Sequence, residues 1–433
     1  MTVVLEILAS QTLPLLTLFA IVLFVLGVRI LLVFGTWAIG YALTHALFPP
    51  INMAIIAYES LNTFAWVAIP LFVIVGSLIG EFGISEDIVD FTNAIAGWLP
   101  GTIGNTAIYT AGVFSAITGS NEATTASVGE ALYDELLDEG YSPNFAAATI
   151  ASGGTVGIII PPSVLFILYG VTFNVSVPAL FQAGIVPGIA MLLVLSAYTS
   201  YTAYTNDYGV GDYDFEPLGI LRATWKAKHA FITVALLVGG VLGGLFTPPE
   251  SAGIAFAYIV VTGLATGRFT DVSQVVSSLK QGVTLTGITV PLYVTSVMVQ
   301  QSLSYEGIQE VVANVITGLP TEWLVIAAMV GLMLFTGSVL ASLPNMIITA
   351  PLLAPVATET LGMHPITWGV VFMMSDAIGF ITPPYGLNLF VISEMTGQEY
   401  MRVARAAVPY LLLLIGVWLT FFLFPNLNVL SPV

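Results

Sequence analysis

The sequence predicts an all-α, polytopic membrane protein with two inverted repeats, each containing a re-entrant helical hairpin and a broken helix. Of the 433 residues, 57% are hydrophobic and only 8% are charged, whereas soluble domains have about 25% charged residues. Apolar runs that approach the length of a bilayer crossing recur along the chain, for example at 15–26 and 410–424. A proline-interrupted apolar segment also occurs twice. These observations predict one integral membrane domain over residues 1–433, with roughly ten or more crossings.

Composition excludes several classes of function. The chain carries eight Lys and Arg residues and a net charge of −17, which excludes nucleic acid as a partner. It has no cysteine and no His-Glu-x-x-His motif, so we expect no thiolate metal site, no cofactor and no enzymatic activity. The acidic clusters indicate solvated loops or helix ends, with adaptation to a saline habitat as the alternative. Arg222, Lys226 and Lys228 form the only cationic cluster, which predicts that the 204–228 connection is cytoplasmic.

The repeat is defined by a constant spacing. Gly157 and Gly379 are 222 residues apart, and so are Pro161 and Pro383, each of which is followed by a second proline. A polar stretch with several acidic residues separates the two copies. The spacing therefore predicts repeat one at about 45–203, a connecting loop at about 204–227, and repeat two at about 228–425.

Each repeat contains two unusual segments. Apolar arms that turn back at small polar residues predict hairpins at about 101–140 and 323–360. Their arms look too short or too polar for a clean crossing, so a re-entrant hairpin with its tip near mid-membrane is expected. Apolar segments interrupted by double prolines predict broken helices at about 144–172 and 365–396. Such duplicated, broken segments indicate the binding site of a secondary transporter.

The chemistry of a broken helix suits an ion. A double proline (Pro161-Pro162 or Pro383-Pro384) removes two backbone donors, which leaves carbonyl groups free for a hard cation such as Na⁺. We expect Thr382 to cap a second half-helix that begins at Pro383 and whose amide end faces an anion. Hairpin tips rich in hydroxyl groups supply further oxygen atoms. The predicted Na⁺-binding residues are Thr118, Gly119, Ser120, Asn121, Gly153, Gly154, Thr155, Gly157, Ser338, Ser342, Asn345, Ser375, Asp376, Ala377, Gly379 and Thr382.

Two carboxylates have open roles. Asp376 lies within an apolar segment, where a charge is costly and usually functional; it binds Na⁺, binds a proton, or accepts hydrogen bonds from its neighbours. Glu122 lies at the first hairpin tip and takes part in binding or faces a water-filled vestibule. The predicted substrate-binding residues are Ser120, Asn121, Glu122, Ser163, Asn345 and Asn388.

Four motifs resemble the large membrane subunit of TRAP (tripartite ATP-independent periplasmic) transporters: FSAITGSNEATTASVG (114–129), ATIASGGTVGIIIPPSVLFILYG (148–170), LFTPPESAG (245–253) and GFITPPYGLNLFVI (379–392). The resemblance implies an elevator mechanism, in which a domain of hairpins and broken helices moves against a scaffold. It also implies Na⁺-driven uptake through two sodium sites, each where a hairpin tip meets a broken helix.

The same resemblance implies partners and a location. It implies a small four-helix membrane subunit, and a periplasmic binding protein that delivers a C4-dicarboxylate, sialic acid or similar carboxylate. It places the chain in a bacterial or archaeal cytoplasmic (inner) membrane. The chain departs from the family pattern at Glu122, where a small or apolar residue is usual, and at Ala341, where Asp is common. The alternative is a stand-alone symporter of similar architecture that needs no binding protein.

Overall fold

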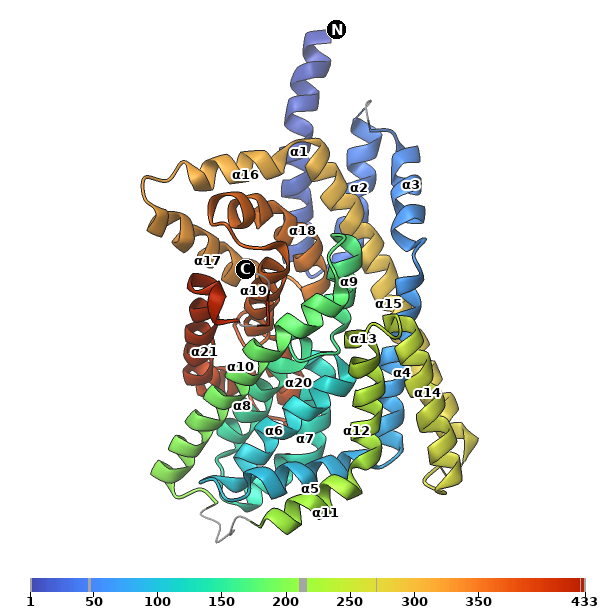
Figure 1. Cartoon of the computed structure of the whole chain (residues 1–433). Coiled ribbons are helices and arrows are strands. Elements are labelled where there is room, and N and C mark those ends of the chain that lie inside the picture. The colour runs from blue at the N-terminus through green and yellow to red at the C-terminus, as the bar shows by residue number, and fades with distance from the viewer. Residues whose placement is uncertain (1, 46–47, 210–215, 270, 429, 432–433) are drawn as a thin grey trace.

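The computed structural model describes residues 2–45, 48–209, 216–269, 271–428 and 430–431, and these residues form helices and turns without a strand. The prediction of an all-α fold is confirmed (Figure 1). The helices up to the end of the first repeat are α1 (Thr2–Val25), α2 (Ile30–Thr44), α3 (Pro50–Leu61), α4 (Ala68–Glu81), α5 (Ile84–Ala96), α6 (Thr102–Thr118), α7 (Asn121–Asp138), α8 (Pro143–Gly153), α9 (Val164–Thr172) and α10 (Val177–Asn206). The remaining helices are α11 (Pro217–Lys226), α12 (Lys228–Val234), α13 (Gly240–Leu242), α14 (Pro248–Ala265), α15 (Val272–Tyr305), α16 (Ile308–Thr317), α17 (Glu322–Val339), α18 (Ser342–Pro355), α19 (Pro365–Gly379), α20 (Leu387–Thr396) and α21 (Tyr400–Leu423).

Several helices begin with a side-chain cap. Ser176 accepts a hydrogen bond from the amide of Ala179 at the start of α10. Thr247 and Glu250 form a capping box at the start of α14, where two prolines occupy the first helical positions. These side chains satisfy amide groups that have no partner in the first turn.

Fewer helices qualify as complete membrane spans than the sequence predicted. By length and composition, four helices of the described residues can cross a bilayer, namely α10, α15, α17 and α21. The count rises to six if the bent pairs α4–α5 and α11 with α12–α13 each form one span. The difference arises because many apolar segments, such as α2, α9 and α20, are short or interrupted. Conversely, α17 is long and apolar enough to cross, so the expectation that the hairpin arms are too short or too polar is wrong for this arm.

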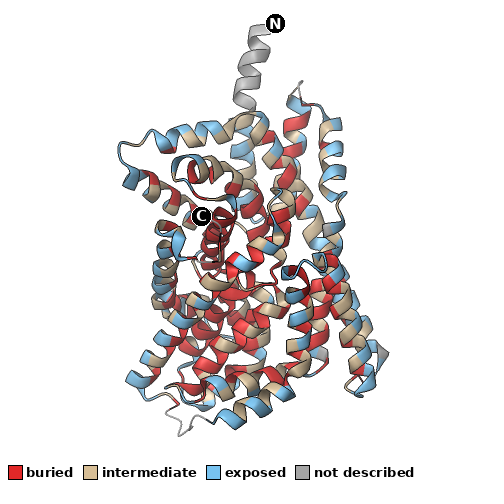
Figure 2. Cartoon of the chain, viewed as in Figure 1, coloured by how far each residue is buried: buried red, intermediate tan, exposed pale blue. Residues whose placement is uncertain are grey.

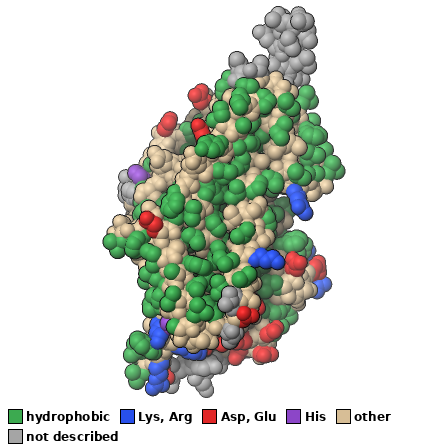
Figure 3. All heavy atoms as spheres, turned by 90° about the vertical axis from the view of Figure 1, so that its right-hand side faces the viewer, with side chains coloured by type: hydrophobic (Ala, Val, Ile, Leu, Met, Phe, Trp, Pro, Cys, Tyr) green, Lys and Arg blue, Asp and Glu red, His purple; other side chains and the backbone are tan. Residues whose placement is uncertain are grey.

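The outer surface suits a lipid environment. Large apolar side chains such as Leu43, Phe335 and Leu412 are exposed on the described helices. Hydrophobic side chains cover most of the face seen in Figure 3, while Lys and Arg gather towards its lower part. An apolar surface of this kind is normally covered by a lipid bilayer or by a partner protein. Together with the apolar helices, it marks the chain as a multi-pass membrane protein.

The core of the molecule is built from the segments on either side of the double prolines. Every residue of α8 from Phe145 to Gly153 is buried, as is every residue of α19 from Ile366 to Gly379. Figure 2 shows this buried centre, with exposed residues concentrated on the outer helices. Helices α4, α14 and α15 pack together beside the centre. Helix α5 lies at the lower end and α16 at the upper end of the molecule (Figure 1).

The connection between the repeats is partly helical. Helix α10 continues to Asn206, and α11 occupies residues 217–226 of the predicted loop. Residues 210–215, which include the acidic Asp212 and Asp214, lie outside the described residues.

Candidate functional site

The first double proline interrupts a buried helix. Helix α8 ends at Gly153, a 3₁₀ turn follows over Gly154–Ile158, and α9 begins at Val164. The Pro161-Pro162 peptide bond is cis. Ser163 lies between the prolines and α9, and its Oγ accepts a hydrogen bond from the Phe166 amide at 3.3 Å. Because the prolines cannot donate hydrogen bonds, the helix cannot continue through them.

The first hairpin tip lies against this break. Helix α6 ends at Thr118, and Gly119 has a φ of +61°, which a side chain would strain. A Cβ on Gly119 would lie 2.8 Å from the Pro162 carbonyl oxygen, so the tip and the proline pair are in direct contact. Ser120 caps α7, and the Thr118 hydroxyl lies 2.8 Å from that of Thr124.

Asn121 connects the tip to the 3₁₀ turn. Its Oδ1 accepts a hydrogen bond from the Ile158 amide at 2.9 Å. A Cβ on Gly157 would lie 2.5 Å from the Ser120 carbonyl oxygen, and one on Gly154 would lie 1.9 Å from Thr125 Oγ1. The structure thus brings the predicted residues of the first tip and the first break together. Gly153 differs, because its empty side-chain position faces Ala111 and Ile108 of α6, which indicates helix packing.

A residue of the second repeat reaches the first break. Asn388, in the first turn of α20, donates a hydrogen bond from Nδ2 to the Ala151 carbonyl at 3.0 Å. The same nitrogen would lie 3.1 Å from a Cβ on Gly154. Asn388 was predicted as a substrate residue, and its place within the first break could not be predicted from the repeat.

The second double proline is followed by a different helix start. Helix α19 ends at Gly379, and α20 begins at Leu387 after Gly386, which has a φ of +43°. The predicted capping role of Thr382 is therefore wrong, because its hydroxyl donates to the Ile378 carbonyl at 2.9 Å. The glycine permits a left-handed turn that delays the helix. The Pro383-Pro384 peptide bond is cis, as in the first break.

The second hairpin tip also contacts its break. A Cβ on Gly379 would lie 2.1 Å from the Gly337 carbonyl oxygen, so the two backbones touch. The Tyr385 amide donates to the Ser338 carbonyl at 3.2 Å. The predicted residues of the second tip and the second break are therefore also brought together.

Asp376 is the central charged group of the second break. It is fully buried, and its Oδ1 accepts a hydrogen bond from Asn345 Nδ2 at 2.9 Å. Among the described residues, neither its Oδ2 nor Ser342 Oγ makes a well-formed hydrogen bond, although the two side chains are close enough to interact. Neither the hairpin nor the broken-helix segments, at 101–172 and 323–396, contain Lys or Arg. A buried carboxylate without a cationic partner is costly unless it is neutralised by a proton or a bound cation.

Several predicted ligands already use their hydroxyl protons within their own helices. Thr155 donates to the Ser152 carbonyl at 2.6 Å, Ser338 to Phe335 at 2.8 Å, and Ser375 to Phe372 at 2.7 Å. Their oxygen lone pairs can still face a cation. Ala377 has no polar side chain, so only its backbone can take part.

Buried polar atoms without partners gather at the two breaks. Among the described residues, seven of the fourteen such side-chain atoms belong to Asn121, Thr125, Ser152, Asn388, Ser342, Asn345 and Asp376. Sequence reasoning missed Thr125 and Ser152. Thr125 follows Asn121 by one helical turn and Ser152 adjoins Gly153, so helical periodicity was the signal available. Buried polar atoms of this kind are candidates for binding a ligand or an ion.

The predicted substrate residues fall into two groups. Asn121, Ser163, Asn345 and Asn388 are fully buried and already hydrogen-bonded within the protein. Ser120 and Glu122 are partly exposed, and Ser120 Oγ donates to Glu122 Oε2 at 2.6 Å. Glu122 is also close enough to Tyr385 and Asp376 to interact with them electrostatically. Of these six residues, only Ser120 and Glu122 are accessible to a solute.

The donor set suits a hard cation. No group of three or more His, Cys, Asp or Glu residues that could hold a metal is found in the described part of the chain. The two breaks offer carbonyl, hydroxyl and amide oxygens with one carboxylate, which is not a set that favours a transition metal.

Comparison with known proteins identifies related chains. Residues 15–427 match the family model described as "Tripartite ATP-independent periplasmic transporter, DctM component". The C4-dicarboxylate TRAP transporter large permease protein DctM of Pseudomonas aeruginosa is 31% identical over 382 residues, which cover 86% of this chain and 88% of that protein. The isethionate TRAP transporter permease protein DctMQ of Oleidesulfovibrio alaskensis is 30% identical over 396 residues. That match covers 91% of this chain but only 62% of the longer relative.

A solved structure shares the fold. The YdaH transporter of Alcanivorax borkumensis, described as having an unusual topology, aligns with a TM-score of 0.58 and 15% sequence identity. The alignment covers 87% of this chain and 89% of that one. At this identity the likeness concerns the fold alone.

Proposed function

Because the chain belongs to the DctM family, the large membrane subunits of tripartite ATP-independent periplasmic transporters, we propose that it imports a small organic acid in symport with Na⁺. The names of its relatives include C4-dicarboxylate, isethionate and sialic acid transporters. All three substrates are small organic acids. The proposed substrate class is therefore a carboxylate or a similar small anion.

The observation that carries Na⁺ coupling is the environment of Asp376. Its carboxylate is fully buried, and among the described residues one of its oxygen atoms, Ser342 Oγ and Asn345 Oδ1 make no well-formed hydrogen bond, although Ser342 lies close enough to interact with the carboxylate. A Na⁺ ion between these oxygen atoms would neutralise the charge and satisfy all three groups. The alternative is a proton on Asp376 Oδ2, which would neutralise the charge and could be donated to only one of the other two oxygen atoms.

We propose a second Na⁺ site at the first break. Its candidate ligands are neutral. They include the unpartnered oxygen atoms of Thr125 and Ser152, the backbone of the Gly154–Ile158 turn, and Asn121 Oδ1, which also accepts from the Ile158 amide. The substrate would lie near Ser120 and Glu122, between the two hairpin tips. Since Glu122 is negative, an anionic substrate there would depend on nearby Na⁺ and on helix amide groups for its affinity.

The coupling ion can be identified by imposing a Na⁺ gradient and a pH gradient in separate experiments. Purified protein in proteoliposomes, with its binding protein outside, should take up labelled substrate when an inward Na⁺ gradient is imposed at equal pH. Screening C4-dicarboxylates, sialic acid and other organic acids identifies the substrate. Uptake driven by a pH gradient without Na⁺ would refute Na⁺ coupling and support protonation of Asp376.

The proposed partners are a small membrane subunit and a periplasmic binding protein, and the proposed location is the inner membrane. One relative's name, DctMQ, describes a single permease protein, and the chain spans only 62% of it. The extra length is sufficient for an additional membrane subunit. Omitting the binding protein separates this proposal from the stand-alone symporter, because only the latter would continue to transport at an unchanged rate.

The proposed movement is that of an elevator, in which the hairpins and broken helices shift against α2, α4 and α15. A cysteine pair can test it, since the chain has no cysteine of its own. A Cβ on Gly76 of α4 would lie 3.6 Å from Thr118 Cα at the first tip. Oxidation of a Gly76→Cys/Thr118→Cys pair should stop uptake, and reduction should restore it to the level of the Thr118→Cys single variant, because Thr118 is itself a predicted Na⁺-binding residue.

A matched pair controls for the crosslink itself. A Cβ on Gly35 of α2 would lie 3.6 Å from Thr295 Cγ2 of α15, so both positions belong to the proposed scaffold. A disulfide between cysteines at these positions should leave uptake unchanged. Full uptake by the crosslinked Gly76/Thr118 pair would contradict movement of the first tip along α4.

A further inference from the structure

Helix α11 exposes an apolar face at the lower end of the molecule (Figure 1). None of its ten residues is buried. Leu218, Leu221 and Trp225 are 61%, 66% and 71% exposed, and their spacing places them on one side of the helix. The helix packs against α5. A helix of this kind beside membrane-crossing segments is suited to the bilayer interface.

A groove lies where α11 meets α12. The two segments are bent by 69° relative to one another. The groove has a volume of about 670 Å³ and is lined by Leu221, Arg222, Thr224, Trp225, Lys228, Phe231 and Ile232. Its lining is therefore apolar and aromatic with two cations, and it contains no acidic residue.

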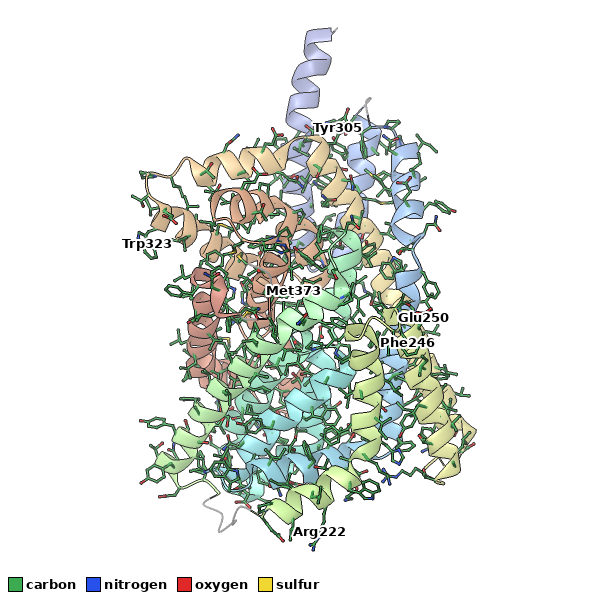
Figure 4. All side chains as sticks on the ribbon, viewed as in Figure 1. Arg222, Phe246, Glu250, Tyr305, Trp323 and Met373 are labelled. Atoms are coloured by element: carbon green, nitrogen blue, oxygen red, sulfur yellow. The ribbon has the colours of Figure 1, made fainter. Side chains whose placement is uncertain are left out.

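The cations of this region are not equivalent. Lys226 forms ion pairs with Asp87 and Asp90 of α5. Arg222 and Lys228 form no ion pair within the described ranges of the chain, and Lys228 Nζ lies 4.6 Å from the ring centre of Trp225. Figure 4 shows Arg222 at the lower edge of the molecule, pointing away from α11. In a chain with a net charge of −17, this groove presents two cations that have no acidic partner among the described residues.

We propose that the groove between α11 and α12 binds the headgroup phosphate of an anionic phospholipid. Arg222 and Lys228 contact the phosphate, and Leu221, Trp225 and Phe231 contact the glycerol and the upper acyl chains. Basic residues in a groove at the membrane surface favour anionic lipid by charge, and tryptophan favours the interfacial region. The positive residues predict that this is the cytoplasmic leaflet.

Native mass spectrometry of the purified chain in detergent can test this proposal. Titration with phosphatidylglycerol should show tighter binding than titration with phosphatidylcholine. An Arg222→Gln/Lys228→Gln variant should bind phosphatidylglycerol roughly tenfold more weakly and lose the preference. An Arg402→Gln/Arg405→Gln variant is the matched control. It removes the same charge from the exposed start of α21, where Arg402 pairs with Glu399, and should retain the preference.

A third variant, Trp225→Ser, should weaken the binding of both lipids without changing the ratio of their affinities, because it removes apolar contact but no charge. Equal binding of both lipids by the native chain would overturn the proposal. An equal loss of phosphatidylglycerol affinity in the groove variant and in its control would also overturn the proposal. The proposal would also be overturned if the groove variant, produced together with the small membrane subunit, no longer bound that subunit but kept its lipid preference. A protein would then occupy the groove.

Discussion

The two helix breaks share a backbone design but differ in charge. At the first, the unpartnered buried atoms belong to the neutral residues Asn121, Thr125, Ser152 and Asn388. At the second, one of them is an oxygen of the Asp376 carboxylate. A cation at the second break would be neutralised directly, whereas one at the first would depend on oxygen dipoles alone. The second break should therefore contribute more to Na⁺ affinity than the first.

The largest expected effect comes from removing that charge. Asp376→Asn should weaken Na⁺ binding by about 3 kcal/mol, roughly 100-fold, because the ion would lose its only buried counter-charge. The measurement is the Na⁺ dependence of uptake and of thermal stability. Asn345 can still hydrogen-bond the new side chain, so the fold should survive. An unchanged Na⁺ titration would remove Asp376 from the ion site.

The next effect tests the contact between the second tip and its break. Gly379→Ala should destabilise the protein by about 1–3 kcal/mol, because its Cβ would lie 2.1 Å from the Gly337 carbonyl oxygen. Gly416→Ala in α21 is the control, since nothing lies within 4 Å of that position. Thermal unfolding in detergent measures both variants. Equal stability of the two would show that the tip can move away at little cost.

A smaller effect is expected at the first break. Thr125→Val keeps the shape of the side chain but removes a buried hydroxyl that has no partner. If that oxygen binds Na⁺, the affinity should fall by about 1 kcal/mol, or roughly fivefold. Thr420→Val is the control, because that hydroxyl donates to its own helix at the Gly416 carbonyl. A loss as large as that of Asp376→Asn would contradict the proposed difference between the breaks.

The smallest effect is expected for Ser338→Ala. The Ser338 hydroxyl donates to the Phe335 carbonyl, and its own carbonyl accepts from Tyr385. If the backbone provides the ligand, the Na⁺ affinity should change by less than about 0.5 kcal/mol. Na⁺-dependent thermal shift is sufficient to measure this. A change of tenfold or more would identify the hydroxyl oxygen as a direct ligand.

Local chemistry predicted the breaks and the tips well. Double prolines and small residues indicated where helices stop, and the structure ends α8 at Gly153 and α19 at Gly379. The start of the helix after the second double proline was predicted wrongly. It begins at Leu387, after the left-handed Gly386, and is not capped by Thr382. The repeat spacing shows which positions of the two repeats correspond, but it does not predict contacts between the repeats. The contact of Asn388 with Ala151 is an example. The groove at α11 also depends on a bend between two helices that composition does not reveal.

The hydrogen bond from Asn388 to the Ala151 carbonyl has a thermodynamic consequence. It ties the helix that follows the second double proline to the end of α8 at the first. If an ion at either location fixes its surrounding backbone, it also restrains the other location through this bond. By reciprocity, each bound ion would then raise the affinity for its counterpart by the same factor. Half-loaded protein would be scarce, and loading would depend on ion concentration more steeply than with independent sites.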